Sequence, residues 1–308
     1  MLSSTVLGAS RVQLPVAPYV LLLDFLCERF TSVSRESWHQ RMLAGKVLNQ
    51  QQESLLPDEP YQVGAVVYYF REVAHELVIP FTETILFQDE HLVVVDKPHF
   101  LPTMPAGRYV EETLLRRLMK RLDNPDIVPI HRLDRLTAGV VLFSINPHTR
   151  DAYQGLFRQR KVMKCYEALA GALPQLQWPY RHRSRLESAQ QFFRMQEVVG
   201  VANSDTVIEV CEQQGDVWRY RLYPVTGRKH QLRVHMAALG AAILNDPLYP
   251  ELQSEPDQQS FSQPLQLLAR HISFIDPLTG ILRGFKSQLT LTLPTLVTKA
   301  GQESSKRL

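Results

Sequence analysis

Hydrophobic residues recur at helical spacing near the start of the chain. One face of a helix would carry Val20, Leu23, Leu26, Cys27 and Phe30. A second helix is predicted over residues 35–44, with Ser34 as its N-cap. Short strands are predicted over 46–48 and 65–70. This pattern indicates a small α+β domain over residues 18–78, preceded by a loose tail over residues 1–17.

The rest of the chain mixes short apolar runs with amphipathic segments. Strands are predicted over 85–87, 91–96, 140–145, 162–169 and 217–223, and helices over 111–122, 149–160 and 228–239. Strands and helices follow no regular βαβ rhythm. The pattern therefore predicts an α+β fold with a mixed or mainly antiparallel central sheet and flanking helices. We expect this larger domain to span residues 84–298, with a frayed tail over 299–308.

Composition supports an ordered protein of more than one domain. The chain has 308 residues, of which 44% are hydrophobic and 21% are charged. Its three cysteines lie far apart in sequence, without zinc-binding spacing, which is typical of reduced thiols in the cytosol. An apolar stretch over residues 19–23 ends at Asp24, so we expect neither export nor a membrane span. The expected location is the cytoplasm.

Charge is distributed unevenly along the chain, although the formal net charge is only +3. Residues 1–80 contain 6 Lys and Arg against 8 Asp and Glu. Residues 150–194 contain 9 basic residues against 3 acidic ones, and residues 215–235 contain 5 against 1. A local basic surface of this kind suits a phosphate backbone, although a solvated charged face fits the counts equally well.

Residues 129–139, which read Pro-Ile-His-Arg-Leu-Asp-Arg-Leu-Thr-Ala-Gly, hold the most informative carboxylate. Asp134 has Arg132 and Arg135 close on either side, and a nearby cation stabilises the charged form of a carboxylate. The small residues that follow would let a bulky substrate approach the backbone closely. Taken alone, such a pair is usually a surface ion pair that contributes little to stability. The wider context must therefore decide.

Further segments carry polar residues in suggestive positions. Residues 164–168 read Lys-Cys-Tyr-Glu-Ala, and residues 245–249 read Asn-Asp-Pro-Leu-Tyr. Residues 226–236 read Thr-Gly-Arg-Lys-His-Gln-Leu-Arg-Val-His-Met and open a predicted helix. Thr226 would cap that helix, and Gly227 would allow an anion to approach its positive end.

Taken together and in this order, these segments resemble the motifs of the RluA-type RNA pseudouridine synthases. The resemblance covers residues 84–295 and includes residues 268–280, which read Leu-Ala-Arg-His-Ile-Ser-Phe-Ile-Asp-Pro-Leu-Thr-Gly. Residues 18–75 resemble a degenerate S4-type RNA-binding module. The resemblance implies the pseudouridine synthase catalytic fold, tRNA or rRNA as the partner, a monomer, and no cofactor.

The resemblance also implies roles for individual residues. Asp134 matches the essential aspartate, which attacks or deprotonates the ribose while the uracil glycosidic bond breaks. The freed base then turns and rejoins the ribose through its C5 atom. Arg233 matches the arginine that pairs with this aspartate, and Tyr166 matches the tyrosine that stacks on the uracil. Arg132 matches the residue that helps to fill the gap left by the flipped nucleotide.

Other residues in these motifs are candidates for substrate binding, namely His131, Arg135, Thr137, Lys164, Thr226, Arg228, Lys229 and His230. In isolation, a tyrosine such as Tyr166 is more often a core aromatic, and an arginine such as Arg233 more often pairs on a helix surface. His131 fits a structural hydrogen-bonding role better than that of a general base. The histidine spacings predict no metal site.

Some positions depart from the family pattern, namely Ala138, Lys229, Asn245 and Pro250, but none removes a charge that the chemistry needs. The acidic N-terminal domain is expected to add little RNA affinity. Loops over residues 100–110, 174–185 and 251–263 are expected to select the uridine. Two alternatives stay open: a non-catalytic RNA-binding or assembly factor on the same fold, and a hydrolase, which lacks a nucleophile or metal.

Overall fold

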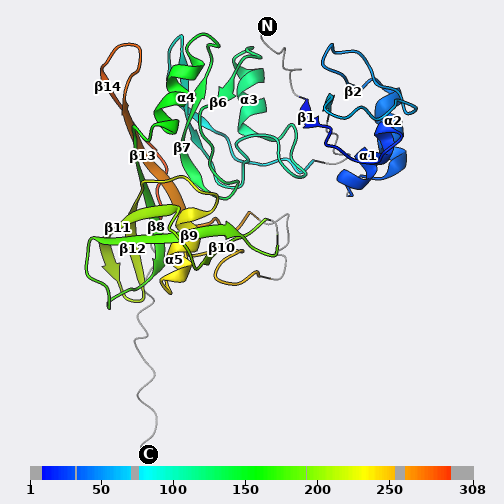
Figure 1. Ribbon diagram of the computed structural model, residues 1–308. Coiled ribbons are helices and arrows are strands. Elements are labelled where there is room, and N and C mark those ends of the chain that lie inside the picture. Colours follow the sequence, from blue (N-terminus) through cyan, green and yellow to red (C-terminus); the bar gives the residue numbers. More distant parts are fainter. Residues whose placement is uncertain (1–8, 32, 71–75, 192, 254–260, 293–308) are drawn as a thin grey trace, which may run out of the picture. The chain divides into compact units, whose positions relative to one another are not determined.

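The computed structural model describes residues 9–31, 33–70, 76–191, 193–253 and 261–292 (Figure 1). The chain divides into two compact units, Met1–His75 and Glu76–Leu308. The Glu76 carboxylate accepts hydrogen bonds from the backbone N–H groups of Val110, Glu111 and Glu112. Glu76 is therefore tied to the second unit, whereas the expected boundary lay at residue 78. The predicted frayed tail over 299–308 lies outside the described residues.

The first unit is a small α+β domain. Its elements are β1 (Ser10–Gln13), α1 (Leu22–Arg29), α2 (Arg35–Leu43), β2 (Val47–Leu48) and β3 (Val66–Tyr69). The three strands form an antiparallel sheet in the order β1-β3-β2. The backbone N–H of Ser37 donates to the Ser34 hydroxyl, which confirms the predicted N-cap of α2.

The expectation of a loose tail before residue 18 is wrong at Ser10–Gln13. This segment pairs with β3 in the register Val12 to Val67, and the following Leu14 is 3% exposed. Four residues are too few to show a hydrophobic periodicity in the sequence. The segment becomes a strand because it pairs with β3, which is distant in sequence. Around Trp38, the rings of Phe30 and Tyr69 pack at centroid distances of 5.1–5.5 Å.

The second unit is built on one large sheet. Within the described residues its strands are β4 (Thr84–Gln88), β5 (Leu92–Lys97), β6 (Val128–Pro129), β7 (Ala138–Ser144), β8 (Val162–Gly171), β9 (Tyr180–Ser188), β10 (Met195–Val198), β11 (Ser204–Gln214), β12 (Val217–Pro224), β13 (Leu267–Ile275) and β14 (Leu282–Lys286). The order is β10-β9-β11-β12-β8-β13-β7-β5-β4, with β14 paired to β13 and β6 to β7. Among the described pairs, β7 and β13 run parallel and the others antiparallel, which confirms the predicted α+β class.

The described residues of this unit form three helices: α3 (Leu114–Arg121), α4 (Arg150–Arg158) and α5 (Gln231–Ala238). Strand β5 shows why the sheet is covered on both faces. Val93 and Val95 join one core with Leu118 of α3, whereas Leu92 and Val94 join another with Tyr153 of α4. Successive side chains of a strand point to opposite faces, so an uninterrupted apolar run predicts burial on both sides.

A third core lies under the half of the sheet that carries α5. It contains Trp218, Tyr220 and Leu222, which alternate along β12 as predicted, together with Met236 of α5. The predicted loop over residues 174–185 is wrong in part, because β9 begins at Tyr180. Arginines at alternate positions made this strand resemble a solvated loop. Among the described residues, no helix has both the length and the apolar character needed to cross a membrane.

Candidate active site

The loop between β6 and β7 carries Asp134, and its backbone is held at four successive carbonyl groups. The Thr103 hydroxyl donates to the Leu133 carbonyl at 2.9 Å, and the Thr137 N–H donates to the Asp134 carbonyl at 3.1 Å. The Lys97 ammonium donates to the Arg135 carbonyl at 3.2 Å, and His99 Nδ1 donates to the Leu136 carbonyl at 2.7 Å. Because most of these donors come from outside the loop, the backbone around Asp134 has a single well-defined path.

Lys97 ends the apolar strand β5 and is fully buried beneath this loop. Its ammonium donates to the carbonyls of Pro98, Leu101 and Arg135 at 2.7–3.2 Å. Burial lowers the pKa of Lys97 to about 7, while the charge of Asp134 acts in the opposite direction. Lys97 was not among the predicted site residues, although a charged residue at the end of a buried apolar strand is a signal for a structural or functional role.

Arg233 on α5 lies between two carboxylates. Its Nε and Nη2 atoms donate to Asp246 at 2.7 and 2.6 Å, and its Nη1 lies 3.6 Å from Asp134 Oδ2. Arg233 is 2% exposed and the Asp246 side chain is 0% exposed, whereas the Asp134 side chain is 32% exposed. Asp246 therefore fixes the guanidinium, which leaves one edge of it facing the more accessible Asp134.

His230 adds a second donor toward Asp134. The Tyr249 hydroxyl oxygen accepts from the Met195 N–H, so the hydroxyl proton is available to His230 Nδ1 at 2.8 Å. That arrangement places the ring proton on His230 Nε2, which lies 3.8 Å from Asp134 Oδ2. Burial lowers the pKa of His230 to about 4, so the ring is neutral at pH 7. Asp246 and Tyr249 were not among the predicted site residues, although both lie in the turn over residues 245–249 that carries a family motif.

A cavity of about 110 Å³ lies at this point, and the Tyr166 ring on β8 forms part of its wall. Burial and the nearby charge of Asp134 raise the pKa of the Tyr166 hydroxyl. Of the predicted site residues, the cavity brings together Asp134, Tyr166, Arg233, Arg132, Thr137, Lys164, Thr226, Arg228 and His230. Residues from β8, α5 and two separate loops thus meet around one small space.

Three predicted site residues do not line this cavity. The ring nitrogen Nε2 of His131 accepts from the Leu142 N–H, and the ring stacks on Phe157 with centroids 4.8 Å apart. Burial lowers the pKa of His131 to about 3, which suits a structural acceptor. The guanidinium of Arg135 lies over the Tyr109 ring, and Lys229 is exposed.

Two local expectations are corrected by the geometry. Thr226 does not cap α5, because the helix begins at Gln231 and its N-cap is His230, with φ +55°. The Thr226 hydroxyl instead donates to the Gln231 side chain and accepts from the Asp205 N–H. Gly139, with φ +113°, leaves room for β13 rather than for substrate, because an added Cβ would lie 2.3 Å from the Ala269 carbonyl oxygen.

Comparison with known proteins assigns the chain to a family. Residues 91–238 match the family model described as RNA pseudouridylate synthase. The dual-specificity RNA pseudouridine synthase RluA of Vibrio cholerae is 32% identical over 214 residues, which cover 65% of this chain and 80% of the relative. The chain belongs to the RNA pseudouridylate synthase family. It is therefore an isomerase that acts on RNA, as its RluA-type motifs predicted.

Other members of the pseudouridylate synthase family agree with this assignment. An RNA pseudouridine synthase of Synechocystis, slr1592, is 28% identical over 245 residues, which cover 74% of this chain and 79% of the relative. Among solved structures, human RNA pseudouridylate synthase domain containing 4 superposes with a TM-score of 0.52 at 27% identity. That match covers 67% of this chain and 88% of the human protein.

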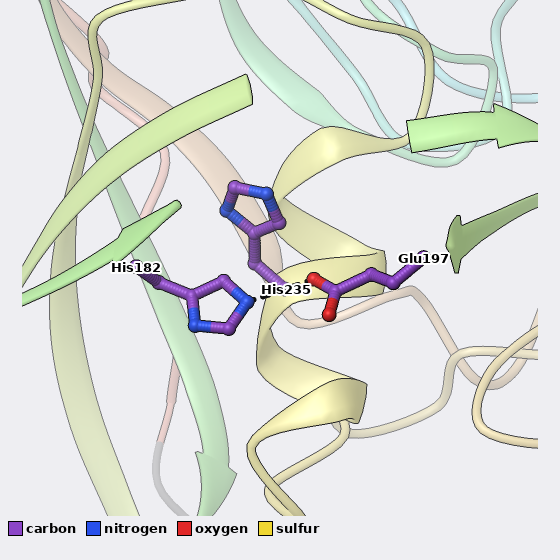
Figure 2. A group of neighbouring side chains, drawn as sticks. All are labelled: His182, Glu197 and His235. Atoms are coloured by element: carbon purple, nitrogen blue, oxygen red, sulfur yellow. Dashed lines mark hydrogen bonds and ion pairs between the residues drawn. The ribbon is translucent and has the colours of Figure 1, made fainter. Parts of the chain in front are cut away.

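Away from the cavity, His182, Glu197 and His235 of this pseudouridylate synthase lie together, and a metal ion would use such side chains (Figure 2). Their ligand atoms lie within 4.8 Å of one another. Both ring nitrogens of His235 are already hydrogen-bonded, Nδ1 to Thr206 and Nε2 to Ser204, each at 2.9 Å. A metal would have to displace these bonds, so the contacts describe a polar network that anchors α5 to the sheet.

Proposed function

We propose that this enzyme converts specific uridines of tRNA or rRNA to pseudouridine in a reaction that depends on Asp134. The observation that carries the proposal is the position of this carboxylate. It is held by a rigid loop, faces the fixed guanidinium of Arg233, and shares a small cavity with the Tyr166 ring. The supporting contacts hold the carboxylate beside the cavity, with the Arg233 guanidinium on one side of it.

The proposed reaction is an isomerisation of one nucleotide. The bond between uracil N1 and ribose C1′ breaks, and a new bond forms between C5 and C1′ after the base turns. The C5 proton is lost and N1 gains a proton, so no electrons leave the substrate. Asp134 acts either as the nucleophile toward the ribose or as the base that removes a ribose proton, and Arg233 and His230 stabilise its charge.

The target base must leave its helix to react. The cavity, about 110 Å³ in volume, is smaller than the roughly 300–1,000 Å³ sites that bind drug-sized molecules, and it suits a single base. Extrusion of a base costs a few kcal/mol, and stacking on the Tyr166 ring would return roughly 1–3 kcal/mol. We propose that Arg132, which is exposed at the cavity rim, enters the gap that the base leaves.

The first unit is proposed to be an S4-like module that contributes little to RNA affinity, since residues 1–80 are net acidic. We also propose a cytoplasmic location, with which the three free cysteines are consistent.

The test compares wild-type protein with Asp134→Ala and Asp134→Asn. RNA from cells that lack the gene is incubated with each protein, and pseudouridines are mapped across tRNA and rRNA. We expect new pseudouridine at defined sites with the wild type and a loss of at least about a thousandfold in rate with both variants, because no other group replaces the carboxylate. RNA affinity should change less than about threefold.

The alternative function, a non-catalytic RNA-binding factor, makes the opposite prediction. In that case the wild-type protein binds RNA but forms no pseudouridine on any tRNA or rRNA, and the Asp134 variants behave like the wild type. That result would refute the proposed activity.

A further inference from the structure

Two residues beyond the end of α4, Arg160 adopts an unfavourable backbone conformation. The Lys161 N–H donates to the Leu156 carbonyl, and the Arg160 N–H donates to the Phe157 carbonyl. These two bonds form a Schellman motif, in which Arg160 occupies the left-handed position with φ +56°. Glycine is favoured at this position because its lack of a Cβ removes the steric penalty. Local stability therefore does not explain the arginine.

The exposed Arg160 side chain lines a cavity of about 340 Å³. Lys164 of β8 and Arg228 of the loop before α5 line the same cavity, and none of its lining residues, all in the described part of the chain, is acidic. In that part, Arg160 and Lys164 make no ion pair, and Arg228 donates to the Asn203 carbonyl. Burial lowers the pKa of the Lys164 ammonium, and the nearby charge of Arg160 lowers it further. The three basic side chains therefore lie close together with no acidic residue among the lining residues of the cavity.

This cationic groove is continuous with the active-site cavity. Lys164, Thr226, Gly227 and Arg228 line both spaces. A nucleotide whose base enters the active-site cavity would therefore have to lead its backbone past these residues.

We propose that the groove lined by Arg160, Lys164 and Arg228 binds a backbone phosphate of the RNA strand next to the flipped uridine. The identity of the anion as an RNA phosphate rests on the proposed function. Arg160 offers a planar, permanently charged donor to the phosphate oxygens, and Lys164 offers a point charge from the floor of the groove. The phosphate neutralises cations that the protein leaves unpaired.

The experiment uses Arg160→Gly in the full chain, because glycine suits the left-handed position. We expect the midpoint of urea denaturation to stay the same or rise, while RNA affinity falls. The probe is a fluorescent 12-nucleotide oligouridylate, measured by anisotropy between 50 and 200 mM KCl. Its affinity should fall roughly three- to tenfold at the lower salt concentration, and the slope of log K against log salt should become shallower by about 0.7.

The matched control is Arg158→Gln, which removes one positive charge from the last turn of α4, two residues before Arg160. Arg158 is exposed, pairs with Asp151 at 2.8 Å, and does not line the groove. Its affinity for the oligouridylate should stay within twofold of the wild type. If Arg160→Gly and Arg158→Gln weaken binding equally, or if neither does, the groove is not a phosphate site.

Two results separate this inference from the proposed function. Wild-type protein that forms pseudouridine while Arg160→Gly keeps wild-type affinity and salt slope would overturn the groove alone. Protein that forms no pseudouridine, yet loses oligouridylate affinity on Arg160→Gly, would retain the groove as a nucleic-acid site and remove the catalytic proposal. A wild-type protein with no measurable affinity for the oligouridylate at 50 mM KCl would also overturn the groove.

Discussion

The outward side of β12 and the groove beside Arg160 both lie in stretches where basic residues outnumber acidic ones, yet their electrostatics differ. On β12, Arg219 Nε lies 3.1 Å from Glu212 and its Nη1 lies 3.7 Å from Glu167. In the groove, Arg160 and Lys164 have no acidic partner among the described residues. A basic stretch of sequence therefore gives a cationic surface only where folding leaves its charges without acidic partners.

The same contrast holds inside the active site. Arg233 has a complete pair with Asp246 and a second, looser contact with Asp134. The tight pair fixes the geometry, and the loose contact leaves Asp134 accessible. Variants that remove a paired charge can be compared with variants that remove an unpaired one, and the comparison tests this view.

The largest effect is expected where the most tightly paired charge is broken. Asp246→Asn leaves the buried guanidinium of Arg233 without its carboxylate, which should lower the free energy of unfolding by roughly 3–5 kcal/mol. Pseudouridine formation should fall at least about a hundredfold, because the guanidinium no longer faces Asp134 in a fixed orientation. Urea denaturation and single-turnover rates measure the two effects.

Asp134→Asn is the control for this variant, since it leaves the pair between Arg233 and Asp246 intact. It should abolish activity while changing the free energy of unfolding by less than about 1 kcal/mol. Equal destabilisation by the two variants would contradict the assignment of the tight pair to structure and of the loose contact to chemistry.

The second effect concerns four buried histidines of the second unit. Burial lowers the pKa values of His131 and His235 to about 3 and those of His99 and His230 to about 4, below the usual 6.5. The unfolded chain therefore binds more protons than the folded one between pH 6.5 and 4. Stability is fully present above pH 6.5 and is lost as pH falls, by about 1.4 kcal/mol per unit for each histidine.

His131→Gln checks this sign at the groove, where protonation would add charge close to Lys164. Glutamine keeps an acceptor for the Leu142 N–H but cannot titrate. The slope of unfolding free energy between pH 6 and 5 should become shallower by about 1.4 kcal/mol per unit. A wild-type stability that is constant down to pH 4.5 would contradict the prediction.

A smaller effect separates the two basic surfaces directly. Lys164→Gln should weaken binding of the oligouridylate roughly three- to tenfold, because it removes an unpaired charge. Arg219→Gln removes a paired charge and should change affinity less than twofold, while it lowers stability by about 1 kcal/mol through loss of its bond to the Leu291 carbonyl. Equal losses of affinity would show that charge count, not pairing, governs binding.

The smallest effect is expected from the first unit. Deletion of residues 1–75 keeps Glu76, whose carboxylate holds the backbone of residues 110–112. RNA affinity of the shortened protein should stay within about tenfold of the full chain. A loss of several orders of magnitude, with the second unit still folded by circular dichroism, would assign the main RNA contacts to the first unit instead.

Local patterns predicted those parts of the fold that local interactions specify. The N-cap at Ser34 and the alternation along β12 follow from neighbours within a few residues, and both were correct. The strand β1 and the start of β9 were missed, because their order comes from pairing with strands distant in sequence. Likewise, the N-terminus of α5 was placed too early, since Thr226 bonds to Asp205 rather than capping the helix.

The sequence by itself determined the family and the α+β class, because the motifs occur in a fixed order and each motif is a short continuous segment. Only the tertiary structure decided which charges are paired. It showed that Asp246 is the close partner of Arg233, and that Arg160 has none in the described part of the chain. Electrostatic energy depends on the distance between groups in space, and that distance is set by folding rather than by spacing along the chain.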